Sequence, residues 1–156
     1  MSEPSSPNEQ RRRSQGERRA DTIDLLLAAT IDTIAELGYH RATTAEICAR
    51  AGVTHGALFH HFKSRVDLVL AALQRMTGER IARYMEFAED MRASAGEPLD
   101  LLRMVGTLAR DDVATVWAEI TVAARTDPEL RERVEPAIDT RWALIRAAAA
   151  TFPGLA

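Results

Sequence analysis

Apolar side chains recur along most of this chain at intervals of three and four residues, which is the period of one face of an α-helix. The clearest case is the segment 18–37, whose regularly spaced apolar residues are Ile23, Leu27, Ile31 and Ile34. Gly38 follows directly, and glycine is the residue most often found just after the C-terminus of a helix. The pattern therefore predicts a first amphipathic helix over about residues 18–37.

Two short helices are predicted next, separated by a turn at Gly52. Thr43 and Glu46 have the spacing of a capping box, in which the two side chains bond to free backbone N–H groups at a helix start. Thr54 can cap the second short helix, and Leu58 lies on its inward face. Helices this short are not stable alone in water. Both must therefore pack against the first helix.

The helical pattern continues beyond this unit. A long fourth helix is predicted from Ser64 to about residue 91. Further helices are predicted to start at about Pro98, at Asp111 or Asp112, and at about Asp127. Pro136 should kink or break the last of these, because proline lacks the N–H that a helix interior needs. No alternating strand pattern, internal repeat or heptad run is present. We therefore predict an all-α protein of about seven helices.

Composition adds only limits to this picture. The chain has 156 residues, of which 46% are hydrophobic and 28% charged, as in an ordinary soluble globular protein. Residues 1–17 are rich in Ser, Pro, Gln and Arg, which predicts a disordered basic tail. The single cysteine, Cys48, excludes an internal disulfide, and no secretory signal or membrane-spanning run is visible. A cytoplasmic location is therefore expected.

The net charge of −3 is unevenly divided along the chain. Residues 1–65 carry +1 and the remainder carries −4. A charge of +1 is not a strong basic footprint, so a DNA-binding function must depend on where the charges lie. The basic residues that matter are Arg11, Arg12, Arg13, Arg18 and Arg19 near the start, and Lys63 and Arg65 after the second short helix.

The two short helices around Gly52 form a helix-turn-helix pattern. If their inner residues pack on the first helix, the outer face of the second short helix is free to enter a DNA major groove, which is wide enough for one helix. Its first residues, Thr54, His55, Gly56 and Ala57, would then meet the base edges. His60, Lys63 and Arg65 lie where phosphates would run. This placement predicts DNA binding.

The segment from about Arg18 to Leu70 resembles the N-terminal domain of the TetR family of bacterial transcriptional regulators. The motifs that match are Gly38-Tyr39, Thr43-Thr44, Ile47, Ala51-Gly52-Val53, Gly56-Ala57-Leu58, His61-Phe62-Lys63-Ser64 and Asp67-Leu68. The resemblance implies a homodimer that binds a palindromic double-stranded operator, usually as a repressor released by a small ligand. The DNA-binding residues so predicted are Thr43, Thr44, Thr54, His55, Gly56, Ala57, Phe59, His60, His61, Lys63 and Arg65.

The same resemblance predicts the division of the chain. Residues 1–17 would be the tail, 18–66 the helix-turn-helix DNA-binding domain, and 67–156 a helical region for ligand binding and dimerisation. Few charged residues lie on the inner faces of that region, which favours an apolar or aromatic ligand. The residues predicted either to line its pocket or to fill the core are Met85, Leu101, Met104, Trp117, Ile120 and Trp142.

Three departures from the family pattern are visible. Ala45 stands where the family often has Arg, and Phe59 where it usually has Tyr, so two phosphate-contacting groups are absent. Relatives also continue for one or two more helices, which build the dimer interface, so a shortened C-terminus is expected. The apolar face of the last helix would then be partly exposed as an association surface. An alternative function is a shortened partner that forms inactive heterodimers.

Other chemistries find little support in the sequence. No catalytic triad spacing, glycine-rich phosphate loop or paired metal ligands are present, so neither an enzyme nor a cofactor is predicted. His55 and His60 are five residues apart, and no carboxylate or cysteine completes a tetrahedral metal site with them. Cys48 lies on the inner, small-residue side of the first short helix, which favours a packing role over a redox role.

Overall fold

The computed structural model describes residues 7–94 and 112–149, and every regular element within these ranges is an α-helix. The helices are α1 (Pro7–Leu37), α2 (Thr44–Ala51), α3 (His55–His61), α4 (Arg65–Ser94), α6 (Asp112–Ala123) and α7 (Pro128–Ala149). The predicted all-α fold is thus confirmed. The helix predicted to start at Pro98 lies outside the described residues.

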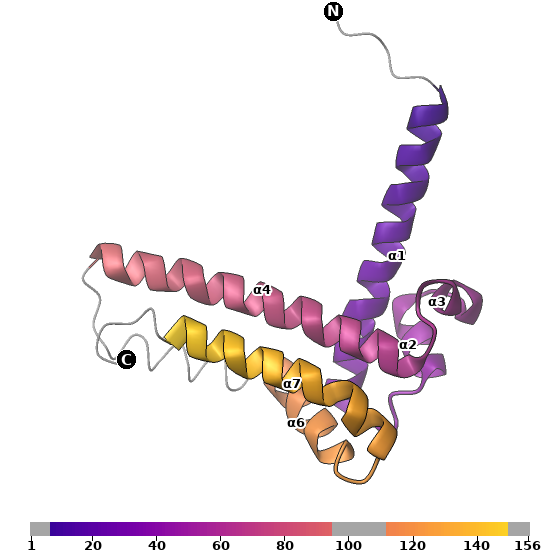
Figure 1. The fold of residues 1–156 in the computed structure, drawn as a ribbon. Helices are drawn as coiled ribbons and strands as arrows, with labels where there is room; N and C mark the ends of the chain where they lie inside the picture. The colour runs from indigo at the N-terminus through magenta and orange to yellow at the C-terminus, as the bar shows by residue number, and fades with distance from the viewer. Residues whose placement is uncertain (1–6, 95–111, 150–156) are drawn as a thin grey trace, which may run out of the picture.

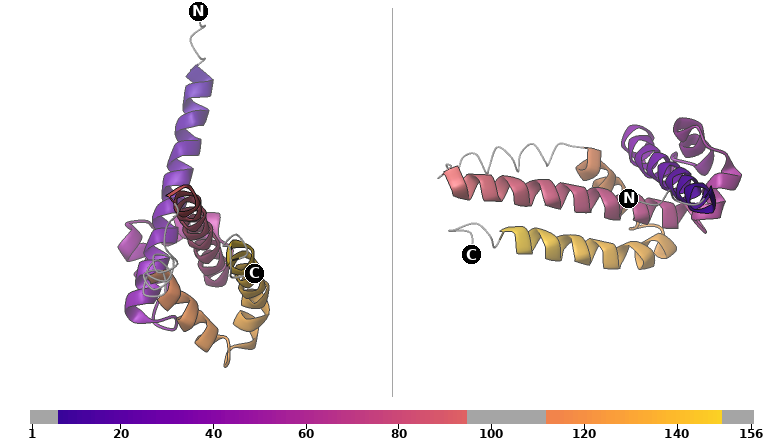
Figure 2. Two further views of the ribbon diagram at one scale, coloured as in Figure 1. Left: turned by 90° about the vertical axis from the view of Figure 1, so that its left-hand side faces the viewer. Right: turned by 90° about the horizontal axis from the view of Figure 1, so that it is seen from above.

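The helices form two groups that share α1 and α4. α2 and α3 lie beside the C-terminal half of α1, while α4 and α7 run side by side with α6 next to them (Figure 1). The N-terminal half of α1 projects away from the other helices in Figure 1 and in the left view of Figure 2. The boundary predicted at residue 66 falls in the first turn of α4. This helix therefore belongs to both groups.

One face of α1 forms the common core. Leu26, Ile31 and Ile34 are completely or almost completely buried, and α1 contacts α2, α3, α4 and α6. Thr30 and Thr33 are buried on the same helix, and their hydroxyls donate to the carbonyls of the preceding turn at 2.7 and 2.6 Å. These bonds remove the cost of burying two polar groups. The apolar side chains spaced along one face of α1 thus lie at the centre of the fold.

The start of α1 differs from the prediction. The helix begins at Pro7, whereas a disordered tail was predicted through residue 17. Glu, Gln and Arg dominate this segment, and all three are good helix formers. Extending an existing helix costs far less than nucleating one, and Pro7 occupies the first helical position, where its missing N–H is tolerated. Residues 15–20 are exposed, so helix propensity rather than burial accounts for this part of the extension.

The apolar face of α7, which was expected to be partly exposed, is covered over its first two turns. Leu130 and Val134 are completely buried, and α7 packs along α4. Trp117 of α6, which was predicted either to line a pocket or to fill the core, has only 4% of its surface accessible, and its indole N–H donates to Thr77 Oγ1 at 3.2 Å. Trp142 alone of these described residues keeps a large exposed area, at 49%. α4 thus covers most of the apolar surface of α7 that further helices were expected to cover.

Pro136 does not break α7, which continues from Pro128 to Ala149. A proline at this position cannot donate to the carbonyl one turn earlier, that of Glu132. Both Glu132 and Pro136 are exposed, so solvent can satisfy the carbonyl that loses its helical partner. Of the predicted kink or break, the break is therefore wrong, because the cost of the missing bond is small at the surface.

A polar contact joins α6 to the end of α1. Gly38 ends α1 with φ = +78°, a left-handed conformation that favours glycine, and its N–H donates to Ile34 O at 2.8 Å. The next residue, Tyr39, donates its backbone N–H to Glu119 Oε2 of α6 at 3.2 Å. Gly38 thus acts as the predicted helix cap. Its position also lets Glu119 approach the backbone closely.

Replacing Gly38 with alanine should therefore destabilise the protein. A Cβ at Gly38 would lie 2.9 Å from Glu119 Oε2, and the left-handed φ adds backbone strain. We expect Gly38→Ala to lower the free energy of unfolding by about 1–2 kcal/mol in urea titrations. Gly78 of α4 provides the control, because a Cβ there meets no atom within 4 Å. Gly78→Ala should instead raise stability by up to about 1 kcal/mol, and equal effects of the two changes would refute this account.

Candidate nucleic-acid interface

α2 and α3 are each started by a threonine side chain. Thr43 Oγ1 accepts from the backbone N–H of Glu46, and Thr54 Oγ1 accepts from that of Ala57, both at 3.2 Å. A threonine hydroxyl that accepts one bond can still donate its own proton. Both threonines are exposed. Both predicted threonine caps are confirmed, but the N–H of Thr43 donates to Arg41 O at 2.8 Å and not to the Glu46 side chain, so only half of the predicted capping box is formed. Each threonine hydroxyl can still donate to a phosphate or a base edge.

The turn between the two helices is made at Gly52. Its φ of +68° is left-handed, and the N–H of Val53 donates to Cys48 O at 3.1 Å. Ile47 and Cys48 of α2 are buried in the core shared with α1. Burial raises the pKa of the Cys48 thiol, so the thiol stays protonated and less reactive. Cys48 is therefore a packing residue, as its position in the sequence indicated.

α3 is held by one buried side chain and presents the rest of its surface outward. Leu58 is completely buried, which contributes about 1.5–3 kcal/mol of hydrophobic free energy. His55, Gly56 and His60 are exposed, and Ala57 is half-buried. A Cβ added to Gly56 would meet only Thr54 Oγ1, at 3.9 Å. The folded chain therefore does not require glycine at position 56, whereas close approach of a ligand to the α3 backbone does favour it.

Phe59 lies on this exposed face, with 53% of its surface accessible. The ring centroids of Phe59 and His55 are 6.4 Å apart. A large apolar side chain so exposed on a short helix contributes little to folding. Together, His55 and Phe59 make an aromatic surface beside Gly56 on the first turns of α3.

The N-terminal arginines lie closer to α3 than the sequence suggested. Arg18 and Arg19 of α1 line one groove with His60 and His61, with a volume of about 480 Å³. Burial, followed by the positive charges of His60 and Arg19, lowers the pKa of His61. Arg18 and Arg19 thus share one surface with the histidine pair, which we call the α1–α3 groove. One signal was available in the sequence, because Arg19 is one helical turn before the core residue Ile23.

Lys63 and Arg65 differ in position although both were predicted to contact phosphates. Lys63 is exposed in the link between α3 and α4. Arg65 is directed into the protein, where its Nε donates to Ala42 O at 2.9 Å and its Nη2 donates to Tyr39 O. Its guanidinium also stacks on the Tyr39 ring at 4.0 Å from the centroid. The position of Arg65 supports a structural role rather than the predicted phosphate contact.

The remaining predicted DNA-binding residue, Thr44, is half-buried at the first position of α2. Its neighbours on the exposed surface are Thr43 and the first turn of the helix. The N-terminal end of a helix carries free N–H groups and a partial positive charge. This end of α2 is therefore chemically suited to an anion such as a backbone phosphate.

The predicted ligand-binding residues fall into different environments. Ile120 is completely buried and belongs to the core, Met85 is half-buried, and Leu101 and Met104 lie outside the described residues. Trp117 lines a cavity of about 320 Å³ between α4, α6 and α7. Arg133 and Arg141 line the same cavity. We refer to it as the α4–α6–α7 cavity, and its two arginines were not predicted from the sequence.

The described residues contain no group of three or more His, Cys, Asp or Glu side chains that could hold a metal ion. Among the same residues, no helix is long and apolar enough to cross a membrane.

Comparisons with known proteins agree with this geometry. Residues 26–72 match the family described as bacterial regulatory proteins, tetR family. An uncharacterized HTH-type transcriptional regulator of Mycobacterium tuberculosis is 34% identical over 142 residues, covering 91% of this chain and 73% of the relative. A transcriptional regulator from Rhodococcus sp. Rha1 has a similar structure, with a TM-score of 0.58 and 30% identity. That similarity covers 76% of this chain and 64% of the Rhodococcus chain, which is less than two thirds of its length.

A further structural similarity is to the multidrug binding protein EbrR, solved in complex with imidazole. The TM-score is 0.59 and the identity is 26%, over 88% of this chain and 70% of that chain. The fold, the two capped short helices and these similarities define a helix-turn-helix transcriptional regulator. The chain belongs to the tetR family of bacterial regulatory proteins and is a DNA-binding regulator, not an enzyme. The family resemblance seen in the sequence is confirmed.

The different positions of Arg65 and Lys63 lead to different expected effects on stability. Arg65→Ala removes the donors to two backbone carbonyls and should lower the free energy of unfolding by about 1–3 kcal/mol. Lys63→Ala removes an exposed side chain and should change it by less than about 0.5 kcal/mol. Thermal unfolding of both variants, followed by circular dichroism, measures this difference. An Arg65→Ala variant as stable as Lys63→Ala would show that the inward contacts contribute nothing.

Proposed function

We propose that this protein is a repressor that binds a palindromic operator as a homodimer through α3 and leaves it when a small ligand binds. The observation that carries the proposal is the exposed first turn of α3, where Thr54, His55 and Gly56 face outward while Leu58 anchors the helix. A helix presented in this way fits the major groove, which is about 12 Å wide. Side chains at its N-terminal end then reach the base edges.

In this proposal, different residues make the base-specific contacts and the sequence-independent contacts to phosphates. His55 and Thr54 carry hydrogen-bonding groups and lie at the start of α3, so they would read bases. Lys63 and the α1–α3 groove would contact phosphates on either side, because counterion release favours cations there. Phe59 would add an apolar contact, for example to a thymine methyl group. Thr43 and Thr44 would contact a phosphate at the start of α2.

The homodimer follows from the small size of the reading surface. One α3 of seven residues contacts few bases, so a monomer would bind weakly. A two-fold symmetric pair of chains would read two half-sites about 34 Å apart, one turn of the double helix. The alternative function, an inactive heterodimer partner, is less well supported, because the recognition surface described here keeps its exposed polar and basic side chains.

The α4–α6–α7 cavity supports the ligand-dependent part of the proposal. It is lined by the Trp117 ring and by residues of α4 and α7, and its size of about 320 Å³ suits a small molecule. The similarity to a protein described as multidrug binding is in line with a small-molecule ligand. Trp117 would contact the apolar part of that ligand.

The proposed function is tested with DNA from upstream of the protein's own gene. In an electrophoretic mobility assay, a discrete band that unlabelled specific DNA displaces, and random DNA does not, would support an operator-binding regulator. A transcription assay on the same DNA then separates the two directions of control. Less transcript on adding the protein supports a repressor, and more transcript would make the protein an activator instead.

His55 and Lys63 should contribute to DNA affinity in two different ways that can be measured. Lys63→Ala should weaken binding to all DNA about equally and reduce the salt dependence of log K by roughly one unit of slope. His55→Ala should instead lose about 1–3 kcal/mol on the operator and little on random DNA. Fluorescence anisotropy at several salt concentrations measures both effects. Equal losses on the two kinds of DNA for His55→Ala would remove His55 from the residues that determine specificity.

Self-association should be visible without DNA. Light scattering of the chain at micromolar concentration is expected to give the mass of a dimer, and sedimentation of the operator complex is expected to give two chains per palindrome. A single half-site supplies the control, because it should bind a chain far more weakly than the full palindrome does. A stable monomer that binds one half-site with full affinity would contradict the homodimer proposal.

A further inference from the structure

The α1–α3 groove brings together positive and titratable side chains from two helices. Arg18 and Arg19 line it from α1, and His60 and His61 line it from α3. The rings of the two histidines are close, with 5.0 Å between their centroids. No Asp or Glu is among the described residues that line the groove. A groove lined by charges of one sign favours a ligand of the opposite sign.

The two arginines of the groove are available to an external anion. In the part of the chain that the structure describes, neither Arg18 nor Arg19 forms an ion pair, and both are exposed. Arg50 of α2, by contrast, already pairs with Glu36 of α1. Arg18 and Arg19 can therefore bind an anion without giving up a carboxylate partner. A guanidinium also bonds well to a phosphate, because two parallel N–H groups can reach two oxygens.

The groove lies at the end of α3 that a DNA backbone would pass. His55 begins this helix and His61 ends it, and six residues of helix span about 9 Å. The major groove is about 12 Å wide, and the two phosphate backbones border it. If the first turn of α3 reads bases, its last turn therefore lies near one of these backbones. The side chains of Arg18, Arg19 and His60 are exposed, so a strand can approach the groove from outside.

His61 differs from the other members of the groove because part of its ring is buried. Its Nδ1 atom is buried and has no hydrogen-bond partner among the described residues. A charged imidazolium donates from both ring nitrogens, so it would keep one buried N–H unpaired, which is unfavourable. Burial, and then the charges of His60 and Arg19, lowers the pKa of His61. The neutral form of His61 is therefore favoured at neutral pH in the free protein.

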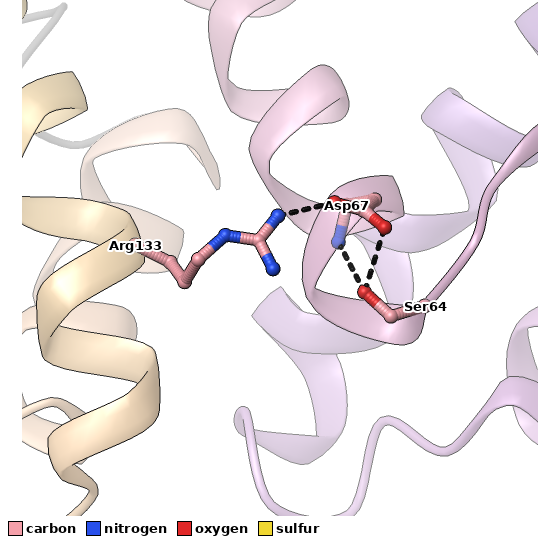
Figure 3. Close-up of polar contacts among 3 residues, drawn as sticks. All are labelled: Ser64, Asp67 and Arg133. Atoms are coloured by element: carbon pink, nitrogen blue, oxygen red, sulfur yellow. Dashed lines mark hydrogen bonds and ion pairs between the residues drawn. The ribbon is translucent and has the colours of Figure 1, made fainter.

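Acidic side chains near the groove do not supply the negative charge that a protonated His61 would need. On α1, Glu17 and Asp21 are exposed and do not line the groove. On α4, Asp67 is the first acidic residue after α3. It accepts from the Ser64 hydroxyl at 2.9 Å and from the guanidinium of Arg133 of α7 (Figure 3). Its carboxylate is therefore already engaged.

The other charged groups around α3 leave the groove positive as well. α2 packs on α3 and carries Glu46 and Arg50, neither of which lines the groove. Lys63 adds a further positive charge just after α3, and Arg65 is bonded inward to Ala42 O. A negative charge beside His61 must therefore come from a molecule that binds there.

We propose that the α1–α3 groove holds one DNA phosphate between Arg19 of α1 and His61 of α3, and that His61 takes up a proton from solvent as the phosphate enters. The inference rests on the proposed function, because it adds Arg18 and Arg19 to the DNA-binding residues and makes DNA binding depend on pH. One phosphate oxygen accepts from Arg19. The ring of His61 can turn about χ2, so a second oxygen can reach the nitrogen that lacks a partner.

Proton uptake gives the DNA affinity a defined dependence on pH. In the free protein the pKa of His61 lies below its ordinary value, and an anion beside the ring raises it in the complex. Between these two pKa values the complex holds a proton that the free protein lacks, so affinity rises as pH falls through this range. Below the lower pKa both states are protonated and the affinity becomes constant. A contact to phosphate carries no sequence information, so the effect is the same on all DNA.

Proton uptake is tested on a random-sequence duplex, which offers phosphates but no operator. Anisotropy of a rhodamine-labelled duplex is measured from about pH 5.5 to pH 8, a range that spans the ordinary pKa of histidine. Affinity should rise by up to about tenfold per bound chain for each unit fall in pH. His61→Gln keeps a hydrogen-bonding side chain that does not titrate, so most of this rise should disappear. An unchanged pH dependence in His61→Gln would overturn the proposal.

Two other histidines distinguish the groove from a general effect of pH. His60→Gln removes a charge that lowers the pKa of His61, so it should keep the rise in affinity and move it to higher pH. His40 precedes α2 and does not line the groove, so His40→Gln should leave the pH dependence unchanged. Loss of the rise in His40→Gln would contradict the assignment to His61.

The arginine contact has a matched control on α4. Arg19→Gln should weaken binding to all DNA and reduce the salt dependence of log K by roughly one unit of slope. Arg83 is also exposed, and it lies about 27 Å along α4 from Arg65, which is well beyond the Debye length of about 8 Å. Arg83→Gln should therefore change neither quantity. Equal effects of Arg19→Gln and Arg83→Gln would mean that only net charge matters, which would overturn the site.

Nuclear magnetic resonance of the histidine rings measures the proton on His61 directly. The His61 signals are identified by their loss in His61→Gln, and adding the random duplex should raise the pKa of His61. An unchanged pKa would overturn the proposal. If millimolar inorganic phosphate raises the pKa as far as the duplex does, the groove is a site for free phosphate, and the DNA site is overturned.

The outcomes for this site and for the proposed function can be told apart. Proton uptake on the random duplex, with no discrete band on DNA from upstream of the gene, would support the site and contradict the operator-binding repressor. A discrete band whose affinity does not depend on pH would support the repressor and overturn the site.

Discussion

The burial of one face of α1 is the interaction on which the rest of the structure depends. Leu26, Ile31 and Ile34 lose almost all contact with water, and each side chain of this kind contributes about 1.5–3 kcal/mol when fully buried. The opposing face of the core is provided by α2, α4 and α6 together. α2 and α3 are too short to be stable alone. Their position, and therefore the position of every candidate DNA-binding residue, depends on packing against α1.

Polar contacts then fix the orientation of helices that apolar burial brings together. Arg65 bonds to the loop between α1 and α2, Glu119 of α6 holds the backbone of Tyr39, and Arg133 of α7 holds Asp67. None of these bonds contributes as much free energy as the buried face of α1. They are directional, however, so they select one arrangement among several that would bury similar apolar area.

Local features of the fold followed from the sequence, and long-range ones did not. The caps at Thr43 and Thr54 and the turns at Gly38 and Gly52 depend on residues within a few positions of each other, and the structure has them as predicted. Whether Arg65 faces water or the protein depends on how close Tyr39 lies to it in the folded chain. The apolar periodicity of the sequence does not reveal that distance. The apolar face of α7 was expected to be partly exposed, and the burial of its members Leu130 and Val134 was not foreseen because the cover that α4 provides is also a long-range property. The early start of α1 was missed because a segment too polar for a core can still extend an existing helix.

The way in which α3 is attached has a consequence for how such a protein can change over time. Leu58 alone of its seven residues is buried. The positions that face outward can therefore be replaced with little loss of stability, since substitutions at exposed sites usually cost less than about 0.5 kcal/mol. Selection for a new binding sequence would meet almost no opposition from folding at these positions. α3, the helix proposed to read the DNA, is thus also one whose outward positions are little constrained by folding.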